Sequence, residues 1–115
     1  MSRDSQAIPS AEAFPLSTLI TPTDRGIASR VLAKADGGNV TLFAFDAGQG
    51  LEEHTSPFDA LVMVLEGTLV LTIGGAAVRA TPGTIVRMPG NLPHALDAPE
   101  PTRMLLVMLR ERKDA

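Results

Sequence analysis

Cysteine is absent from this chain of 115 residues. Disulfides, thiolate zinc sites, iron–sulfur clusters and cysteine nucleophiles are therefore excluded. Aromatic residues are also scarce, with four Phe and neither Trp nor Tyr, so methionine must supply part of the bulk of any core. Runs of Lys or Arg able to neutralise several phosphates are missing, and the formal net charge is only −3. We therefore expect no nucleic-acid partner.

Long apolar runs are missing as well. The first twenty residues mix charges, prolines and serines and lack the apolar core of a secretory signal. No later stretch is apolar for long enough to cross a bilayer, so we expect a cytoplasmic protein without a membrane partner. What the chain does have is the balance of one globular domain, with 44% apolar and 20% charged residues.

The chain divides by composition into two parts. Residues 1–22 contain three prolines and several small polar residues, which favours an extended N-terminal arm with at most one short helical turn in 10–20. Residues 23–112 are expected to form a single β domain, because short runs of Val, Ile, Leu, Thr and Phe each end in Gly or Pro. The expected strands include 27–34, 40–45, 61–66, 69–73, 76–80, 84–88 and 103–109.

Helical spacing of apolar residues is not evident over any long window, and no internal repeat is seen. About eight or nine short strands at nearly even spacing are typical of an all-β sandwich or barrel, which removes exposed sheet edges. The fold class expected from the residues alone is therefore all-β.

Two sequence motifs narrow this expectation. The stretch GQGLEEHTSPFDALVMVLEG, from Gly48 to Gly67, resembles the first conserved motif of the cupin superfamily. The stretch GTIVRMPGNLPH, from Gly83 to His94, resembles the second, in which a glycine and a proline six apart precede a histidine by five residues. The chain thus resembles a small single-domain cupin of the conserved-barrel (cupin 2) type. The resemblance implies a double-stranded β-helix, an RmlC-like jelly-roll barrel.

The metal motif of that superfamily is incomplete in this chain. The resemblance implies three histidines and one glutamate projecting inward, and only His54 and His94 match. Ser56 stands in place of the second histidine and Ala60 in place of the glutamate. Strand alternation predicts that Glu52 and Ser56 share the face of His54.

Two histidines alone fall short of the three protein ligands usual in a catalytic metal site. Glu52 or Asp59 would supply the missing carboxylate, giving a two-His, one-carboxylate face suited to iron, while Zn, Mn or Ni are alternatives. Asp59 follows an expected turn, where aspartate more often bonds backbone amides than metals. A metal-free pair of histidines is the competing interpretation.

Three functions stay open on the sequence. The first is a barrel that binds a small organic molecule in an interior pocket lined by His54, His94, Ser56, Glu52, Met104 and Met108. The second is a metal-dependent enzyme, of the dioxygenase, isomerase or decarboxylase class, that uses His54 and His94. The third is a purely structural dimerisation barrel. Residues 61–65 are apolar on both faces, which together with the resemblance predicts a homodimer.

Overall fold

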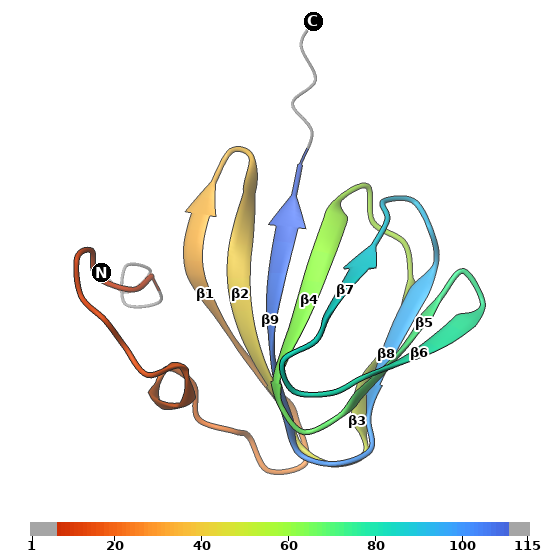
Figure 1. The fold of residues 1–115 in the computed structure, drawn as a ribbon, viewed down its shortest axis with the longest axis horizontal. Helices are drawn as coiled ribbons and strands as arrows, with labels where there is room; N and C mark the ends of the chain where they lie inside the picture. Colours follow the sequence, from red (N-terminus) through yellow and green to blue (C-terminus); the bar gives the residue numbers. More distant parts are fainter. Residues whose placement is uncertain (1–6, 111–115) are drawn as a thin grey trace, which may run out of the picture.

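The computed structural model describes residues 7–110, which form nine strands in two antiparallel sheets (Figure 1). The five-stranded sheet has the order β1-β2-β9-β4-β7, with β1 Ile27–Ala35, β2 Gly38–Phe45, β9 Thr102–Leu109, β4 Asp59–Glu66 and β7 Ile85–Met88. The four-stranded sheet has the order β3-β8-β5-β6, with β3 Gln49–His54, β8 His94–Ala98, β5 Leu69–Ile73 and β6 Ala76–Ala80. The expected all-β fold is confirmed.

Glycine turns set several of these strand boundaries. Gly74 and Gly75 both have positive φ, of 57° and 87°, and they join Ile73 directly to its pairing partner Ala76. A two-residue hairpin loop with positive φ at both positions matches the right-handed twist of the flanking strands. The β5–β6 hairpin is therefore determined locally by the Gly-Gly pair.

The main core lies between the two sheets. Along β4, Ala60, Val62 and Val64 are buried on the inner face, while the residues between them are only partly buried. Met104, the third residue of β9, is 0% exposed and packs in this core. That Met104 also lines a ligand pocket stays a prediction. Buried residues of both sheets complete the cluster, including Phe45, Leu69, Leu71 and Leu96.

A second core lies on the outer face of the five-stranded sheet. Leu19 and Ile20 of the N-terminal arm are buried there against Leu32, Leu42 and Ala44. The arm also donates a hydrogen bond from the Ile8 N–H to the Leu32 carbonyl, at 3.1 Å. One turn of 3₁₀ helix, Leu16–Thr18, interrupts the otherwise irregular arm. The arm is thus docked, and its own apolar residues cover part of the outer face.

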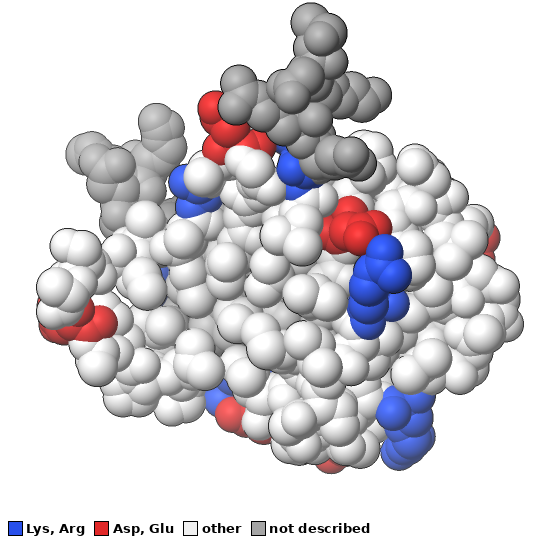
Figure 2. Space-filling model, turned by 45° about the horizontal axis from the view of Figure 1, so that its top comes forward, with Lys and Arg blue, Asp and Glu red and all other residues white. Residues whose placement is uncertain are grey.

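The outer face continues past the arm with further apolar residues. Leu61, Met63 and Val107 are partly exposed, and Ile85 is 56% exposed. Figure 2 shows a face that is mostly uncharged, with its acidic and basic side chains gathered in a few small groups. The arm therefore accounts for some of the apolar surface that motivated the homodimer, and the homodimer itself stays a prediction.

The limits of the expected domains were 1–22 and 23–112. Residues 1–6 and 111–112 lie outside the described residues. Within residues 7–110, no helix is long and apolar enough to cross a membrane.

Candidate functional site

His54 and His94 lie side by side in the four-stranded sheet. His54 is the last residue of β3 and His94 is the first residue of β8, and the two are direct pairing partners. Their ring centroids are 4.4 Å apart, with an angle of 67° between the ring planes. The structure thus brings together the two residues that the motifs singled out.

Backbone carbonyl groups hold both imidazole rings in the same way. The Nδ1 of His54 lies 2.8 Å from the Glu52 carbonyl oxygen, and the Nδ1 of His94 lies 3.0 Å from the Leu92 carbonyl oxygen. Because a carbonyl oxygen only accepts, each Nδ1 must carry the hydrogen. In a neutral imidazole the lone pair then resides on Nε2, so both rings keep Nε2 as an acceptor for a ligand.

The histidines continue the inner apolar face of their sheet. Opposite residues of an antiparallel pair project from the same face, and His94 is opposite both His54 and Ile73 of β5. Two residues further along β8, Leu96 is opposite Leu51 and Leu71 and belongs to the core. His94 is only 6% exposed, whereas His54 is exposed. The pair therefore forms a polar end to an apolar surface, partly open to solvent.

A β-bulge in β3 places His54 on this face. Leu51 pairs with Leu96, and His54 pairs with His94. Two residues of β3, Glu52 and Glu53, therefore lie opposite one residue of β8, Ala95. An extra residue in one strand reverses the alternation of side chains that follows it. Glu52 follows the inward Leu51 directly and is exposed, so the expectation that it shares the face of His54 is corrected.

Ser56 lies beyond the end of β3, in the turn before β4. Its hydroxyl oxygen accepts a hydrogen bond from the Phe58 N–H at 3.1 Å. Its carbonyl oxygen accepts one from the Asn91 N–H at 2.7 Å, which ties this turn to the loop before His94. The contacts that the structure gives Ser56 are therefore those of a turn, and none joins it to the histidines.

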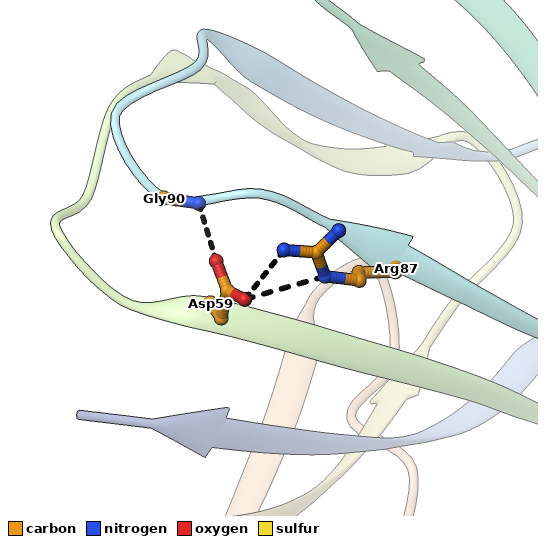
Figure 3. Close-up of polar contacts among 3 residues, drawn as sticks. All are labelled: Asp59, Arg87 and Gly90. Atoms are coloured by element: carbon orange, nitrogen blue, oxygen red, sulfur yellow. Dashed lines mark hydrogen bonds and ion pairs between the residues drawn. The ribbon is translucent and has the colours of Figure 1, made fainter. Parts of the chain in front are cut away.

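Asp59, the other expected carboxylate ligand, is occupied by local bonds (Figure 3). Its Oδ2 accepts from Arg87 at 2.8 Å and 3.2 Å, and its Oδ1 accepts from the Gly90 N–H at 2.9 Å. The Arg87 guanidinium and then the Gly90 amide hold the pKa of Asp59 below its usual value. Asp59 thus fastens the loop that leads to His94 onto the start of β4.

These positions decide whether the site fits a transition metal. Among residues 7–110, no three His, Asp or Glu side chains are grouped so that they could hold a metal ion. The two histidines alone are one ligand short of the usual catalytic centre. The described residues therefore do not fit a three-ligand metal site completed by Glu52 or Asp59.

Met108 lies on β9, opposite Asn39 of β2 and Ala60 of β4. It lines an apolar groove of about 270 Å³ between the β1–β2 hairpin and the end of β9, together with Val40, Val107 and Leu109. Neither histidine lines this groove. That Met108 also lines a pocket with the two histidines stays a prediction.

Ile73 and the two anchoring carbonyl groups were not identified from the sequence. Any residue can supply a backbone carbonyl, so the side chains in the sequence do not indicate which carbonyls bind the rings. The pairing of β8 with β5 is likewise not indicated by any motif. The one available signal for Ile73 was its position as the last residue of a strand, directly before the Gly-Gly turn.

Comparison with known proteins agrees with this architecture. Two packed antiparallel sheets and a paired-histidine motif define a small cupin-type barrel. Residues 41–109, more than half of the chain, match the Cupin_2 family, described as the cupin domain. The chain belongs to this family. No curated protein matches the chain.

Solved structures of similar chains extend over almost all of this one. A conserved protein of unknown function from Streptococcus pyogenes is 33% identical with a TM-score of 0.86, over 92% of this chain and 93% of that one. A cupin superfamily protein from Desulfitobacterium hafniense is 26% identical with a TM-score of 0.84, over 90% and 95%. A cupin 2 conserved barrel domain protein from Leptotrichia buccalis is 30% identical with a TM-score of 0.80, over 84% of this chain and 47% of that one.

Proposed function

We propose that this protein binds a small organic molecule at the His54–His94 pair without a resident metal ion. The observation that carries the proposal is the anchoring of both Nδ1 atoms to backbone carbonyls, which leaves an Nε2 acceptor on each of two neighbouring rings. Binding sites for small molecules combine a largely apolar surface with a few fixed polar groups. Leu51 and Ile73, which are partly buried, supply the apolar surface beside the pair.

A metal-dependent enzyme of the dioxygenase, isomerase or decarboxylase class is the second candidate. The same anchoring supports it, because proteins orient metal-ligating histidines by bonding the other ring nitrogen to a carbonyl or carboxylate. His54 and His94 would hold the ion, which would act as a Lewis acid or redox centre when bound. The missing third protein ligand makes this candidate weaker than direct binding.

Metal analysis separates the two candidates. Protein purified without a histidine tag is dialysed with and without chelator, and its transition-metal content is measured by elemental analysis. Direct binding predicts well under one equivalent of metal in both samples. A near-stoichiometric metal that is lost in both His54→Ala and His94→Ala would contradict the proposal and favour the enzyme.

Ligand binding is tested on the chelator-treated protein. A library of small organic fragments is screened by the ring proton and carbon signals of histidine, of which the chain has only two. The proposal predicts fragments that move the signals of both rings and that no longer bind either alanine variant. A broad library that moves neither ring would contradict it.

The homodimer and the cytoplasmic location belong to the proposal as well. Partly exposed Leu61, Met63 and Val107 on the outer sheet face support self-association, because extended apolar faces are usually covered in soluble proteins. Sedimentation velocity tests it directly. A monomer at micromolar concentration would remove the homodimer from the account and leave the histidine site unaffected.

A further inference from the structure

We propose that the His54–His94 pair selects ligands with a hydrogen-bond-donating head group, an ammonium above all, and discriminates against carboxylates. This inference rests on the proposed function, since it names the chemical class that the same site would bind. It is carried by the contact of each Nδ1 with a backbone carbonyl oxygen, which in the neutral ring leaves the lone pair on Nε2, and by the charges of the surrounding strands.

The hydrogen-bond polarity of the two rings favours a ligand that donates. Each ring donates its Nδ1–H to a backbone carbonyl group, that of Glu52 for His54 and that of Leu92 for His94. In neutral rings the remaining Nε2 atoms can only accept. An ammonium or hydroxyl group donates to them, whereas a carboxylate would place its own lone pairs against theirs. Unmatched polar groups in a partly buried site carry a large desolvation cost.

The charged side chains on the strands around the pair are all acidic. The three neighbouring strands β3, β8 and β5 carry Glu52, Glu53 and Asp97, and they contain no Lys or Arg. All three acidic side chains are exposed. Glu52 and Asp97 point to the opposite face of the sheet from the histidine rings, so their negative field reaches the pair partly screened by solvent and salt. It still favours a cation near the pair over an anion.

The apolar neighbours define the rest of the ligand. Ile73 lies beside His94 on the inner face, and Leu51 precedes the bulge on the same face as His54. Both side chains are partly buried and pack against the main core. A compact hydrocarbon body next to the head group would cover these side chains and gain the free energy of apolar burial. The ligand class is therefore a small amphiphilic amine, with a neutral alcohol as the weaker alternative.

Three probes with one cyclohexyl body test the selection. Cyclohexylamine donates only, cyclohexanol both donates and accepts, and cyclohexanecarboxylate accepts only. Each is titrated into the chelator-treated full chain at pH 8, where an imidazole is neutral, and the ring signals of both histidines are followed. We expect the amine to bind at least about tenfold more tightly than the carboxylate, with the alcohol between them.

Matched variants identify the groups responsible. His54→Asn and His94→Asn retain an N–H near the position of Nδ1 and remove Nε2, so either change should abolish the response of the remaining ring to the amine. Asp97→Asn should weaken the binding of the amine a few-fold and leave the affinity for the alcohol unchanged. Asp36→Asn, in the exposed β1–β2 turn, is the control for a charge change elsewhere.

The outcomes separate this inference from the proposed function. If the protein prefers the amine and each histidine variant loses that preference, the result supports the donor selection and the proposed function together. Equal or tighter binding of the carboxylate to the same two rings overturns the donor selection and leaves the binding site standing. The absence of any ring response to all three probes contradicts the selection, and with a failed fragment screen it contradicts the proposed function too.

Discussion

Thr102 and Thr68 are joined through the side chain of one and the backbone of the other. The Thr102 hydroxyl oxygen accepts a hydrogen bond from the Thr68 N–H at 3.1 Å and lies 2.9 Å from the Thr68 carbonyl oxygen. Thr102 is 2% exposed and Thr68 is 6% exposed, so water cannot easily replace these bonds. The contact fastens the β4–β5 turn to the start of β9, where the two sheets meet.

Replacing Thr102 by Val should destabilise the protein by about 1–3 kcal/mol, because the buried Thr68 N–H loses its partner while the side-chain volume hardly changes. Thr102→Ser keeps the hydroxyl and should recover part of the loss. Urea unfolding followed by far-ultraviolet circular dichroism measures both, since the chain has no Trp for fluorescence. Equal stability of the Val variant and the wild type would show that the bond contributes nothing.

Gly67 in the neighbouring turn should not tolerate a side chain. Its φ is +83°, and an added Cβ would lie 2.2 Å from the Pro101 carbonyl oxygen and 2.5 Å from the Thr102 Oγ1. Gly67→Ala should therefore cost more than about 1–2 kcal/mol through backbone strain and displacement of β9. Gly37→Ala is the control, because no atom lies within 4 Å of its added Cβ. Similar losses in the two variants would refute this explanation of Gly67.

Stability should depend on pH through Asp59 and Asp46. The Arg87 guanidinium lowers the pKa of Asp59, and the Arg25 N–H lowers that of Asp46. A carboxyl group with a depressed folded pKa stabilises the fold above the ordinary value of 3.8 and loses this contribution as pH falls through the folded pKa. We expect the unfolding midpoint in urea to fall between about pH 4 and pH 2.

Asp59→Asn isolates one part of that dependence. The variant should be slightly less stable than the wild type at pH 7, and the difference should shrink as the pH is lowered below 3.8. Asp36→Asn should show no such convergence. A stability difference for Asp59→Asn that stays constant from pH 7 to pH 2 would mean that the Arg87 contact does not act through charge.

The two histidines should differ in their importance for folding. His54 is exposed, so His54→Ala should change the free energy of unfolding by less than about 0.5 kcal/mol. His94 is 6% exposed and packs between strands, so His94→Ala should cost about 1–3 kcal/mol. Urea unfolding of both variants checks this contrast. The reverse order would contradict the burial described here.

Much of the fold could be predicted because local signals coincide with strand boundaries. The Gly74–Gly75 pair separates two runs of β-branched and apolar residues, and the strands on either side were predicted at 69–73 and 76–80 as the structure has them. The cupin motifs then supplied the arrangement of strands, which pattern alone does not encode. Their agreement with the family match explains why the all-β barrel was predicted correctly.

The site was less predictable because it depends on non-local pairing. Alternation was assumed to run through Glu52 and His54, and the bulge opposite β8 breaks it. The complete burial of Met104 depends on which strands flank β9, and these pairings are not local in the sequence. The burial of Leu19 likewise depends on where the arm docks, which its proline-rich composition does not reveal.

The central claim is that both histidines present a lone pair at Nε2. Long-range proton–nitrogen correlation of the ¹⁵N-labelled, tag-free protein at pH 8 measures which ring nitrogen carries the hydrogen, and only two histidines contribute signals. The account predicts the Nδ1–H form for both rings, held by the carbonyls of Glu52 and Leu92. An Nε2–H form at either ring would contradict it.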